Sequence, residues 1–147
     1  MTGRLGVWFM RVLAHVPLPA LRALGWCLGQ LLYVLAVPRR KVALRNLALC
    51  FPKATVAQRS RWARETFVVF CQTWLDRSWL WFAPREVVQR RVRLQGALNE
   101  LEGDTPTIIF APHFYGMDAG GTALTLHTPR AFTSIFSTHR ATCTWWS

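Results

Sequence analysis

The chain has 147 residues, of which 18 are Lys or Arg, 7 are Asp or Glu, and 52% are hydrophobic. This length fits one domain or part of one, and it gives no reason to expect two. The hydrophobic fraction, the eight Trp and the mean hydropathy of +0.17 are high for a small soluble domain. The composition therefore argues against an ordinary soluble domain and favours contact with a membrane.

The net charge of +11 is unevenly distributed, because the first acidic residue of the chain is Glu65. Such asymmetry predicts an anionic partner, either phospholipid headgroups or nucleic acid. Phospholipid is favoured over nucleic acid, because apolar residues separate the cations and no nucleic-acid-binding motif accompanies them. By the positive-inside bias, the cluster from Arg39 to Arg45 and everything after it should face the cytoplasm. The cations before Glu65 are Arg4, Arg11, Arg22, Arg39, Arg40, Lys41, Arg45, Lys53, Arg59, Arg61 and Arg64.

Residues 5 to 37 are almost continuously apolar, and Pro17-Leu18-Pro19 divides them into two pieces. The second piece, Ala23 to Pro38, is shorter than the ~20 residues of a comfortable span, so a span would need Arg22 to reach toward a headgroup. Residues 1–38 are therefore predicted to be a membrane anchor or in-plane amphipathic helices. A cleaved signal peptide is less favoured, because a basic cluster follows the apolar run and no small-residue cleavage site precedes it. A pair of core helices is the alternative without a membrane.

Residues 39–86 are predicted to be a helical region. A short helix over Arg39 to Phe51 should stop at Pro52, and the capping-box pattern Thr55-Val56-Ala57-Gln58 should start a long helix that ends before Pro84. The apolar positions of the long helix recur at three- and four-residue spacing, which is typical of a core-facing stripe. These positions are Trp62, Ala63, Phe67, Phe70, Cys71, Trp74 and Leu75.

The pattern changes after Val87, and residues 87–137 are predicted to be a partial α/β domain. Strand, helix and strand within about 30 residues indicate a βαβ unit and the first part of a mainly parallel sheet. The α/β fold class follows from this segment together with the helical region before it. The expected elements are strands at Val92 to Leu94, Pro106 to Ala111 and Ala131 to Ser137, and helices at Ala97 to Leu101 and Gly116 to Leu126.

The four cysteines, Cys27, Cys50, Cys71 and Cys143, show no C-x-x-C spacing, and three of them lie in strongly apolar surroundings. They are interpreted as buried small hydrophobic residues in a reducing compartment, in preference to a disulfide or zinc framework. No metal site and no bound cofactor is expected.

His113 and Asp118 form the candidate catalytic constellation. His113 follows the predicted strand over Ile108 to Ala111, and Asp118 begins the predicted helix, with Gly116 permitting a tight turn between them. A carboxylate that orients an imidazole can keep it basic enough to deprotonate a hydroxyl. The alternative is that His113 is a hydrogen-bonded structural residue, which a lone His after a strand often is.

The His-x-x-x-x-Asp motif at His113 and Asp118, preceded by Ile108-Ile109-Phe110-Ala111-Pro112, resembles the signature of the glycerolipid acyltransferase superfamily. Within it, the chain is similar to the lipid A biosynthesis late acyltransferases, which transfer lauroyl or myristoyl chains. Three further features carry this resemblance, which covers roughly residues 4 to 137. They are the apolar N-terminus, Val42-Ala43-Leu44-Arg45-Asn46-Leu47 with Cys50-Phe51-Pro52 behind it, and the helix from Arg64-Glu65 to Trp74.

The resemblance implies an enzyme of the cell inner membrane whose catalytic part faces the cytoplasm. It would move a fatty acyl chain from acyl carrier protein, as co-substrate, to a hydroxyl of a lipid A precursor, with no covalent enzyme intermediate. In that scheme His113 matches the general base and Asp118 the carboxylate that orients it. The unopposed cations would suit membrane phospholipid, a negatively charged phosphoglycolipid and an acidic carrier protein.

Members of this family run to about twice the present length, and residues 138–147 do not resemble the family's continuation. The chain is therefore expected to be an N-terminal half with an incomplete α/β domain and an off-pattern tail, and to lack useful activity by itself. The alternative to the enzyme is a non-catalytic membrane-anchoring or scaffold fragment, in which His113 is structural.

Overall fold

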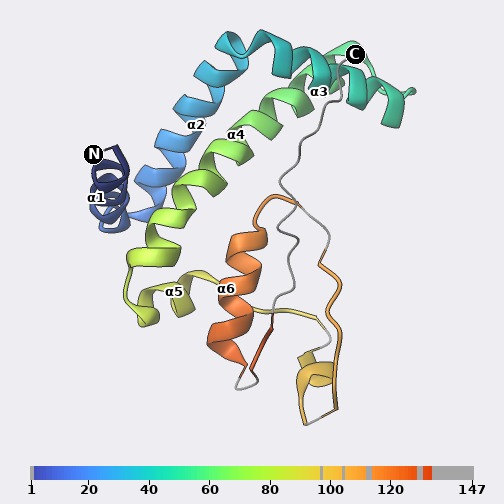
Figure 1. Cartoon of the computed structure of the whole chain (residues 1–147). Coiled ribbons are helices and arrows are strands. Elements are labelled where there is room, and N and C mark those ends of the chain that lie inside the picture. Colours follow the sequence, from blue (N-terminus) through green and yellow to red (C-terminus); the bar gives the residue numbers. More distant parts are fainter. Residues whose placement is uncertain (1, 97, 104, 112–113, 129–130, 134–147) are drawn as a thin grey trace, which may run out of the picture.

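The computed structural model describes residues 2–96, 98–103, 105–111, 114–128 and 131–133. These residues form six α-helices and one short 3₁₀ helix, and none of them belongs to a β-strand (Figure 1). The α-helices are α1 (Thr2–Ala14), α2 (Leu18–Leu35), α3 (Val37–Cys50), α4 (Val56–Phe82), α5 (Arg85–Arg91) and α6 (Met117–His127), and the 3₁₀ helix is η1 (Leu98–Leu101).

A proline-containing break separates the two apolar helices of the N-terminal region. α1 ends before Pro17, and α2 begins directly after it at Leu18, because proline suits the first turn of a helix but breaks its interior. α2 is long and apolar enough to cross a membrane by length and composition, and 17% of it is buried. α1 and α2 therefore correspond to the two pieces into which the proline-containing break divides the apolar stretch.

α4 starts where the capping-box pattern predicted. The Thr55 hydroxyl accepts a hydrogen bond from the Gln58 backbone N–H at 3.2 Å, and the Gln58 side-chain oxygen accepts one from the Thr55 N–H at 2.8 Å. Each of these N–H groups would otherwise lack a partner at the helix start. The long helix runs for 27 residues and ends at Phe82, ahead of Pro84, as predicted.

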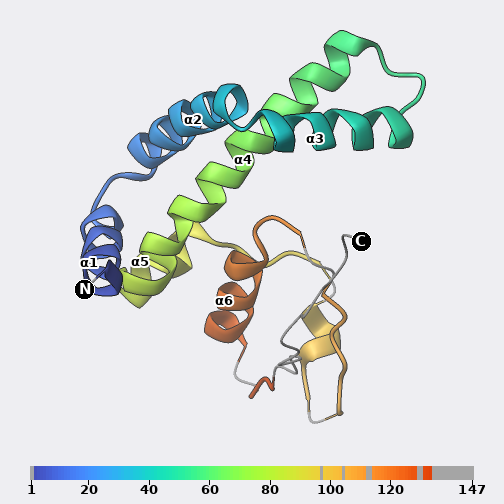
Figure 2. The same cartoon turned by 45° about the horizontal axis from the view of Figure 1, so that its top comes forward.

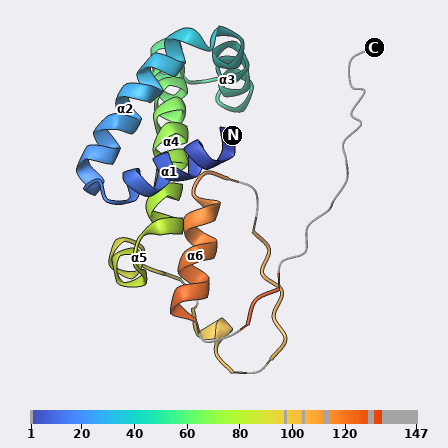
Figure 3. The same cartoon turned by 60° about the vertical axis from the view of Figure 1, so that its left-hand side comes forward.

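α4 is the central element, with α1 and α2 on one side of it and α6 on the other (Figures 1 and 2). Four residues spaced one turn apart, Ala63, Phe67, Cys71 and Leu75, are buried along α4. α2 runs alongside this stripe, and α1 crosses the C-terminal half of α4 (Figure 3). Two core clusters result, with the buried members Met10, Leu13, Leu21, Leu75, Trp79, Leu80 and Val88 in one and Tyr33, Ala63 and Phe67 in the other.

Part of the predicted stripe on α4 does not belong to this core. Phe70 and Trp74 are 45% and 44% exposed, and they line a recess between α4 and the start of α6 instead of joining either core cluster. Helical spacing identified the apolar positions correctly, but it did not distinguish one covered face from two.

The predicted α/β fold is wrong for the part of the chain that the structure describes. Val92 to Leu94 and Pro106 to Ala111 are extended without being strands, and Ile108 and Phe110 are 98% and 88% exposed instead of buried. A strand needs a neighbouring strand to satisfy its backbone groups, and the described residues provide none. The predicted strand over Ala131 to Ser137 is not formed at residues 131–133, and its remainder lies outside the described residues.

The two helices predicted in the same segment are present in the structure. The expected helices over Ala97 to Leu101 and Gly116 to Leu126 correspond to η1 and α6. Local signals, including Gly116 before α6, were sufficient for these elements because their hydrogen bonds close within a few residues.

The interpretation of the cysteines as buried is correct for Cys71 and wrong for Cys27 and Cys50, which are exposed. All three are free thiols. Cys27 lies on the face of α2 opposite α4, and Cys50 is the last residue of α3, so neither reaches a core cluster. Cys143 lies outside the described residues.

Candidate functional site

Asp118 occupies the first turn of α6, directly after a tight turn. Gly116 is the residue before the helix and has φ of +86°, a left-handed backbone conformation that glycine adopts without steric cost. This turn lets the chain pass from the extended segment before it into α6. An acidic side chain in the first turn also interacts favourably with the positive end of the helix dipole.

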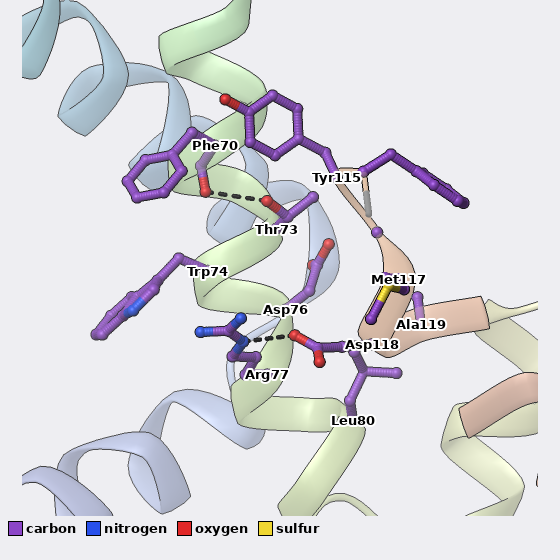
Figure 4. A pocket seen from close by; sticks show the side chains of 12 residues that line it. Phe70, Thr73, Trp74, Asp76, Arg77, Leu80, Tyr115, Met117, Asp118 and Ala119 are labelled. Carbon is purple, nitrogen blue, oxygen red and sulfur yellow. Dashed lines mark hydrogen bonds and ion pairs between the residues drawn. The ribbon is translucent and has the colours of Figure 1, made fainter. Parts of the chain in front are cut away.

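The carboxylate of Asp118 points toward α4 and is held by Arg77 (Figure 4). Arg77 Nε donates to Asp118 Oδ2 at 2.6 Å, a short charge-assisted hydrogen bond. Both side chains are about two-fifths exposed, at 39% and 41%, so the pair remains in contact with solvent. The guanidinium of Arg77 also lies over the ring of Trp81, 5.8 Å from its centroid, which fixes its direction further.

Asp118 lines a small recess between α4 and the start of α6, with a volume of about 190 Å³. Aromatic rings form one wall, since Phe70 and Tyr115 meet edge to face with their centroids 6.2 Å apart. The recess therefore combines a few charged and polar side chains with apolar walls, as small-molecule sites commonly do. Its lining residues are Phe70, Thr73, Trp74, Asp76, Arg77, Leu80, Phe114, Tyr115, Gly116, Met117, Asp118 and Ala119.

A second and larger groove lies on the other side of Tyr115, among α2, α3 and α4. Its volume is about 680 Å³, and its walls are mostly apolar, with Arg39, Asn46 and Thr66 as the polar residues apart from Tyr115. Tyr115 and Phe70 border both the recess and the groove, so the two spaces are neighbours. Asn46 belongs to the block that carried the family resemblance.

Asp76, next to Arg77 on α4, makes the equivalent connection to α2. Arg22 Nη2 donates to both oxygens of Asp76, at 2.8 and 2.9 Å, and Trp79 Nε1 donates to Oδ1 at 2.9 Å. Asp76 is 8% exposed and belongs among the buried residues, where a charge requires such partners. The adjacent residues Asp76 and Arg77 of α4 therefore form one ion pair with α2 and another with α6.

Of the two predicted site residues, the structure describes Asp118 but not His113. Asp118 lies at the start of α6 as expected, while His113 lies outside the described residues, so their pairing stays a prediction. Arg77 holds one carboxylate oxygen of Asp118, and a carboxylate can accept from further donors through its other lone pairs. Among the described residues, no group of three or more His, Cys, Asp and Glu could hold a metal ion.

Arg22, Asp76 and Arg77 were not singled out from the sequence as partners. One signal was present, since Asp76-Arg77 interrupts an otherwise apolar and aromatic stretch of the long helix. Charged residues in such a stretch are seldom buried without a partner. The partners themselves, Arg22 and Asp118, lie 54 and 41 positions away and could not be identified from spacing.

Comparison with known proteins defines the family. Residues 1–146 match the family model described as bacterial lipid A biosynthesis acyltransferase. Since the match covers nearly the whole chain, this protein belongs to the lipid A biosynthesis acyltransferase family. The family expected from the His-x-x-x-x-Asp motif and the Asn46 block is therefore confirmed.

Individual relatives are similar at low identity. A lipid A biosynthesis acyltransferase of Haemophilus influenzae is 29% identical over 140 residues, which cover 92% of this chain and 43% of the relative. The lipid A biosynthesis palmitoleoyltransferase of Escherichia coli is 26% identical over 128 residues, covering 85% and 41%. The lipid A biosynthesis lauroyltransferase of the same organism is 23% identical over 128 residues, covering 85% and 42%.

The chain thus spans 41–43% of the length of these relatives. No solved structure matches it.

Proposed function

We propose that this chain supplies the acid–base pair and the membrane-facing helices of an O-acyltransferase that moves a fatty acyl chain from acyl carrier protein to a hydroxyl of a lipid A precursor. The observation that carries the proposal is the placement of Asp118 in a family member. It stands at the start of α6, five residues after His113, and is held by Arg77 at the edge of an aromatic recess.

The chemistry assigned to the pair is direct acyl transfer. The imidazole of His113 takes the proton from the acceptor hydroxyl as its oxygen attacks the thioester carbonyl. The new C–O bond forms, the C–S bond breaks, and the proton passes from the imidazolium to the leaving thiolate. Asp118 orients the imidazole and stabilises the imidazolium, as carboxylates do beside a catalytic histidine.

Arg77 acts on this pair through Asp118. Its guanidinium holds Oδ2 at 2.6 Å and prevents the carboxylate from rotating away from the turn at Gly116. Arg77 is thus a positioning residue, and its own side chain need not contact the substrates. The cost of losing it should be smaller than the cost of losing the base.

The site is assigned to the cytoplasmic face of the inner membrane. The apolar helix α2 and the cluster from Arg39 to Arg45 support this assignment, because cations beside an apolar segment remain on the cytoplasmic side. Acyl carrier protein and the lipid A precursor are the partners that follow from the family, together with membrane phospholipid.

A chimera tests the proposal, since the relatives extend well beyond the matched region. This chain replaces the matching 41% of the Escherichia coli palmitoleoyltransferase, and acyl transfer from acyl carrier protein to a lipid A precursor is measured in mixed micelles. His113→Ala should lower the rate by about a hundred- to ten-thousandfold, the usual contribution of a general base. Asp118→Asn should also lower it strongly, and Arg77→Lys should retain more activity than Arg77→Gln.

Matched controls separate catalysis from general damage. His127→Ala removes an exposed imidazole at the end of α6, and Glu100→Gln removes an exposed carboxylate in η1. Both should leave the rate of the chimera unchanged. An active chimera that tolerates His113→Ala would refute the assigned base and favour the non-catalytic anchoring fragment.

A further inference from the structure

α1 and α2 pack against α4 on the side away from α6 (Figures 1 and 2), and both helices expose large apolar side chains. Trp8 and Trp26 are 63% and 55% exposed, and tryptophan is typical of the boundary between headgroups and acyl chains. We define the outer surface of α1 and α2 by their large exposed apolar residues. They are Leu5, Val7, Trp8, Phe9, Val12, Leu24, Trp26, Leu28, Leu31, Val34 and Leu35.

The charges around the outer surface fit an anionic lipid bilayer. Arg4 lies near the start of α1, and Arg39, Arg40 and Lys41 follow the end of α2, so cations flank the apolar residues at both ends. No acidic residue precedes Glu65 to oppose them. Cations beside an exposed apolar helical face favour binding at the surface of anionic membranes.

The inner face of α2 is fastened to α4 along its whole length. Near its start, Arg22 pairs with Asp76 at 2.8 Å, and Gln72 Nε2 donates to the Arg22 carbonyl at 3.1 Å. Near its end, Tyr33 meets Phe67 edge to face with ring centroids 5.6 Å apart.

Two glycines bring the backbones of these helices close together between those ends. A Cβ atom added at Gly29 would lie 2.5 Å from Val68 Cα, and one added at Gly25 would lie 2.6 Å from Gln72 Cγ. Because even one added carbon atom would clash at these two positions, no lipid can lie between α2 and α4 there. Any movement of α2 into the bilayer must therefore carry α4 with it, or break every one of these contacts.

α4 carries too many charged residues to enter a membrane alongside α2. Where it lies alongside α2 it bears Arg64, Glu65 and Arg77, and it carries Arg59 and Arg61 closer to its start. A bilayer core is about 30 Å thick, and 18 residues of α-helix span about 27 Å, so α2 could cross only nearly upright. The charged groups of α4 would then sit at the depth of the acyl chains, where each is strongly disfavoured.

We propose that α1 and α2 lie in the plane of the cytoplasmic leaflet as a two-helix platform, with the outer surface in the lipid and α4 above it, and that α2 does not cross the bilayer. This inference deepens the membrane association stated under the proposed function and rests on it. The platform places α6 and Asp118 on the side of α4 that faces the cytoplasm.

Cysteine labelling from each side of the membrane tests the platform. Two variants are made in a background in which all four native cysteines are replaced, His15→Cys between α1 and α2 and Lys53→Cys between α3 and α4. Both positions are exposed and outside helices. The full chain is expressed in Escherichia coli, and a membrane-impermeant maleimide is applied to intact spheroplasts and to inverted inner-membrane vesicles.

An in-plane platform predicts that both variants are labelled in inverted vesicles and that neither is labelled in intact spheroplasts. The proposal would be overturned if Lys53→Cys is labelled only in inverted vesicles while His15→Cys is labelled in spheroplasts. It would also be overturned if Lys53→Cys behaves in this way and His15→Cys is labelled from neither side. The cysteine-free background should remain unlabelled, and detergent-solubilised samples should label in both variants.

Sedimentation of the same samples distinguishes this proposal from the proposed function. A chain that leaves the membrane in a high-salt wash without aggregating would refute the membrane association itself and the platform with it. A chain that stays in the membrane but is labelled from opposite sides would refute the platform alone. Neither measurement depends on acyl transfer, so an inactive chimera would leave the platform intact.

Discussion

Substitution of Gly29 by alanine is the sharpest test of the contact between α2 and α4. The added Cβ would lie 2.5 Å from Val68 Cα and 2.8 Å from Val68 N, both backbone atoms that no side-chain rotation can move. The two helices would have to separate locally, and inserting a carbon into such a packed contact costs about 1–3 kcal/mol.

A second effect of the same substitution opposes the first. Alanine in a helix interior is more favourable than glycine by about 1 kcal/mol, because glycine loses more backbone freedom on folding. Gly6→Ala in α1 is the matched control, since nothing lies within 4 Å of a Cβ added at Gly6. Subtracting the control removes the common gain and leaves the packing cost.

The measurement is thermal unfolding of the two variants in mild detergent, followed by helical circular dichroism. About 1–3 kcal/mol corresponds to a difference of about 2–12 °C between their midpoints for a chain of this size, with Gly6→Ala the higher. If Gly29→Ala is stabilised as much as Gly6→Ala, the backbones of α2 and α4 are not in close contact. Packing against α4 would then no longer prevent α2 from crossing the membrane alone.

Three further outcomes follow from the burial of Asp76 and Cys71. Asp76→Ala should lower the free energy of unfolding by about 1–3 kcal/mol, because it removes the buried partner of Arg22 and Trp79. The control Glu65→Ala breaks an exposed pair with Arg61 and should change the free energy of unfolding by less than about 1 kcal/mol. Equal effects of the two substitutions in denaturant titrations would contradict the burial of Asp76. Burial raises the pKa of the Cys71 thiol, so iodoacetamide at pH 8 should modify Cys71 more slowly than the exposed Cys50. Peptide mass spectrometry measures the two rates, which should become equal after unfolding. Because the folded chain holds the Cys71 proton more tightly than the unfolded chain, this thiol should also reduce stability as the pH rises above 9.0.

Elements whose signals are local were predictable from the sequence. Pro17, Pro52 and Pro84 mark the breaks before α2, after α3 and after α4, and the Thr55 capping box marks the start of α4. Each of these signals acts on backbone groups within one helical turn. Neighbouring residues therefore carried all the information that these predictions needed.

Features that depend on distant partners were not predictable in the same way. Apolar composition at Ile108 to Ala111 suits a buried strand, but it forms one only beside another strand, and the described residues contain none. The exposure of Cys27 similarly depends on which face of α2 meets α4. Periodicity shows that a helix has an apolar face, and it does not show what covers that face.

The adjacent residues Asp76 and Arg77 show why the site and the membrane surface should be considered together. Asp76 reaches Arg22 of α2, and Arg77 reaches Asp118 of α6, although the two side chains start from neighbouring positions on α4. Since successive residues of a helix point about 100° apart, one turn of α4 can hold elements on two of its faces. A displacement of α2 that rotated α4 would therefore move Arg77 and the carboxylate it holds, so the packing at Gly29 bears on the position of Asp118 as well as on the membrane.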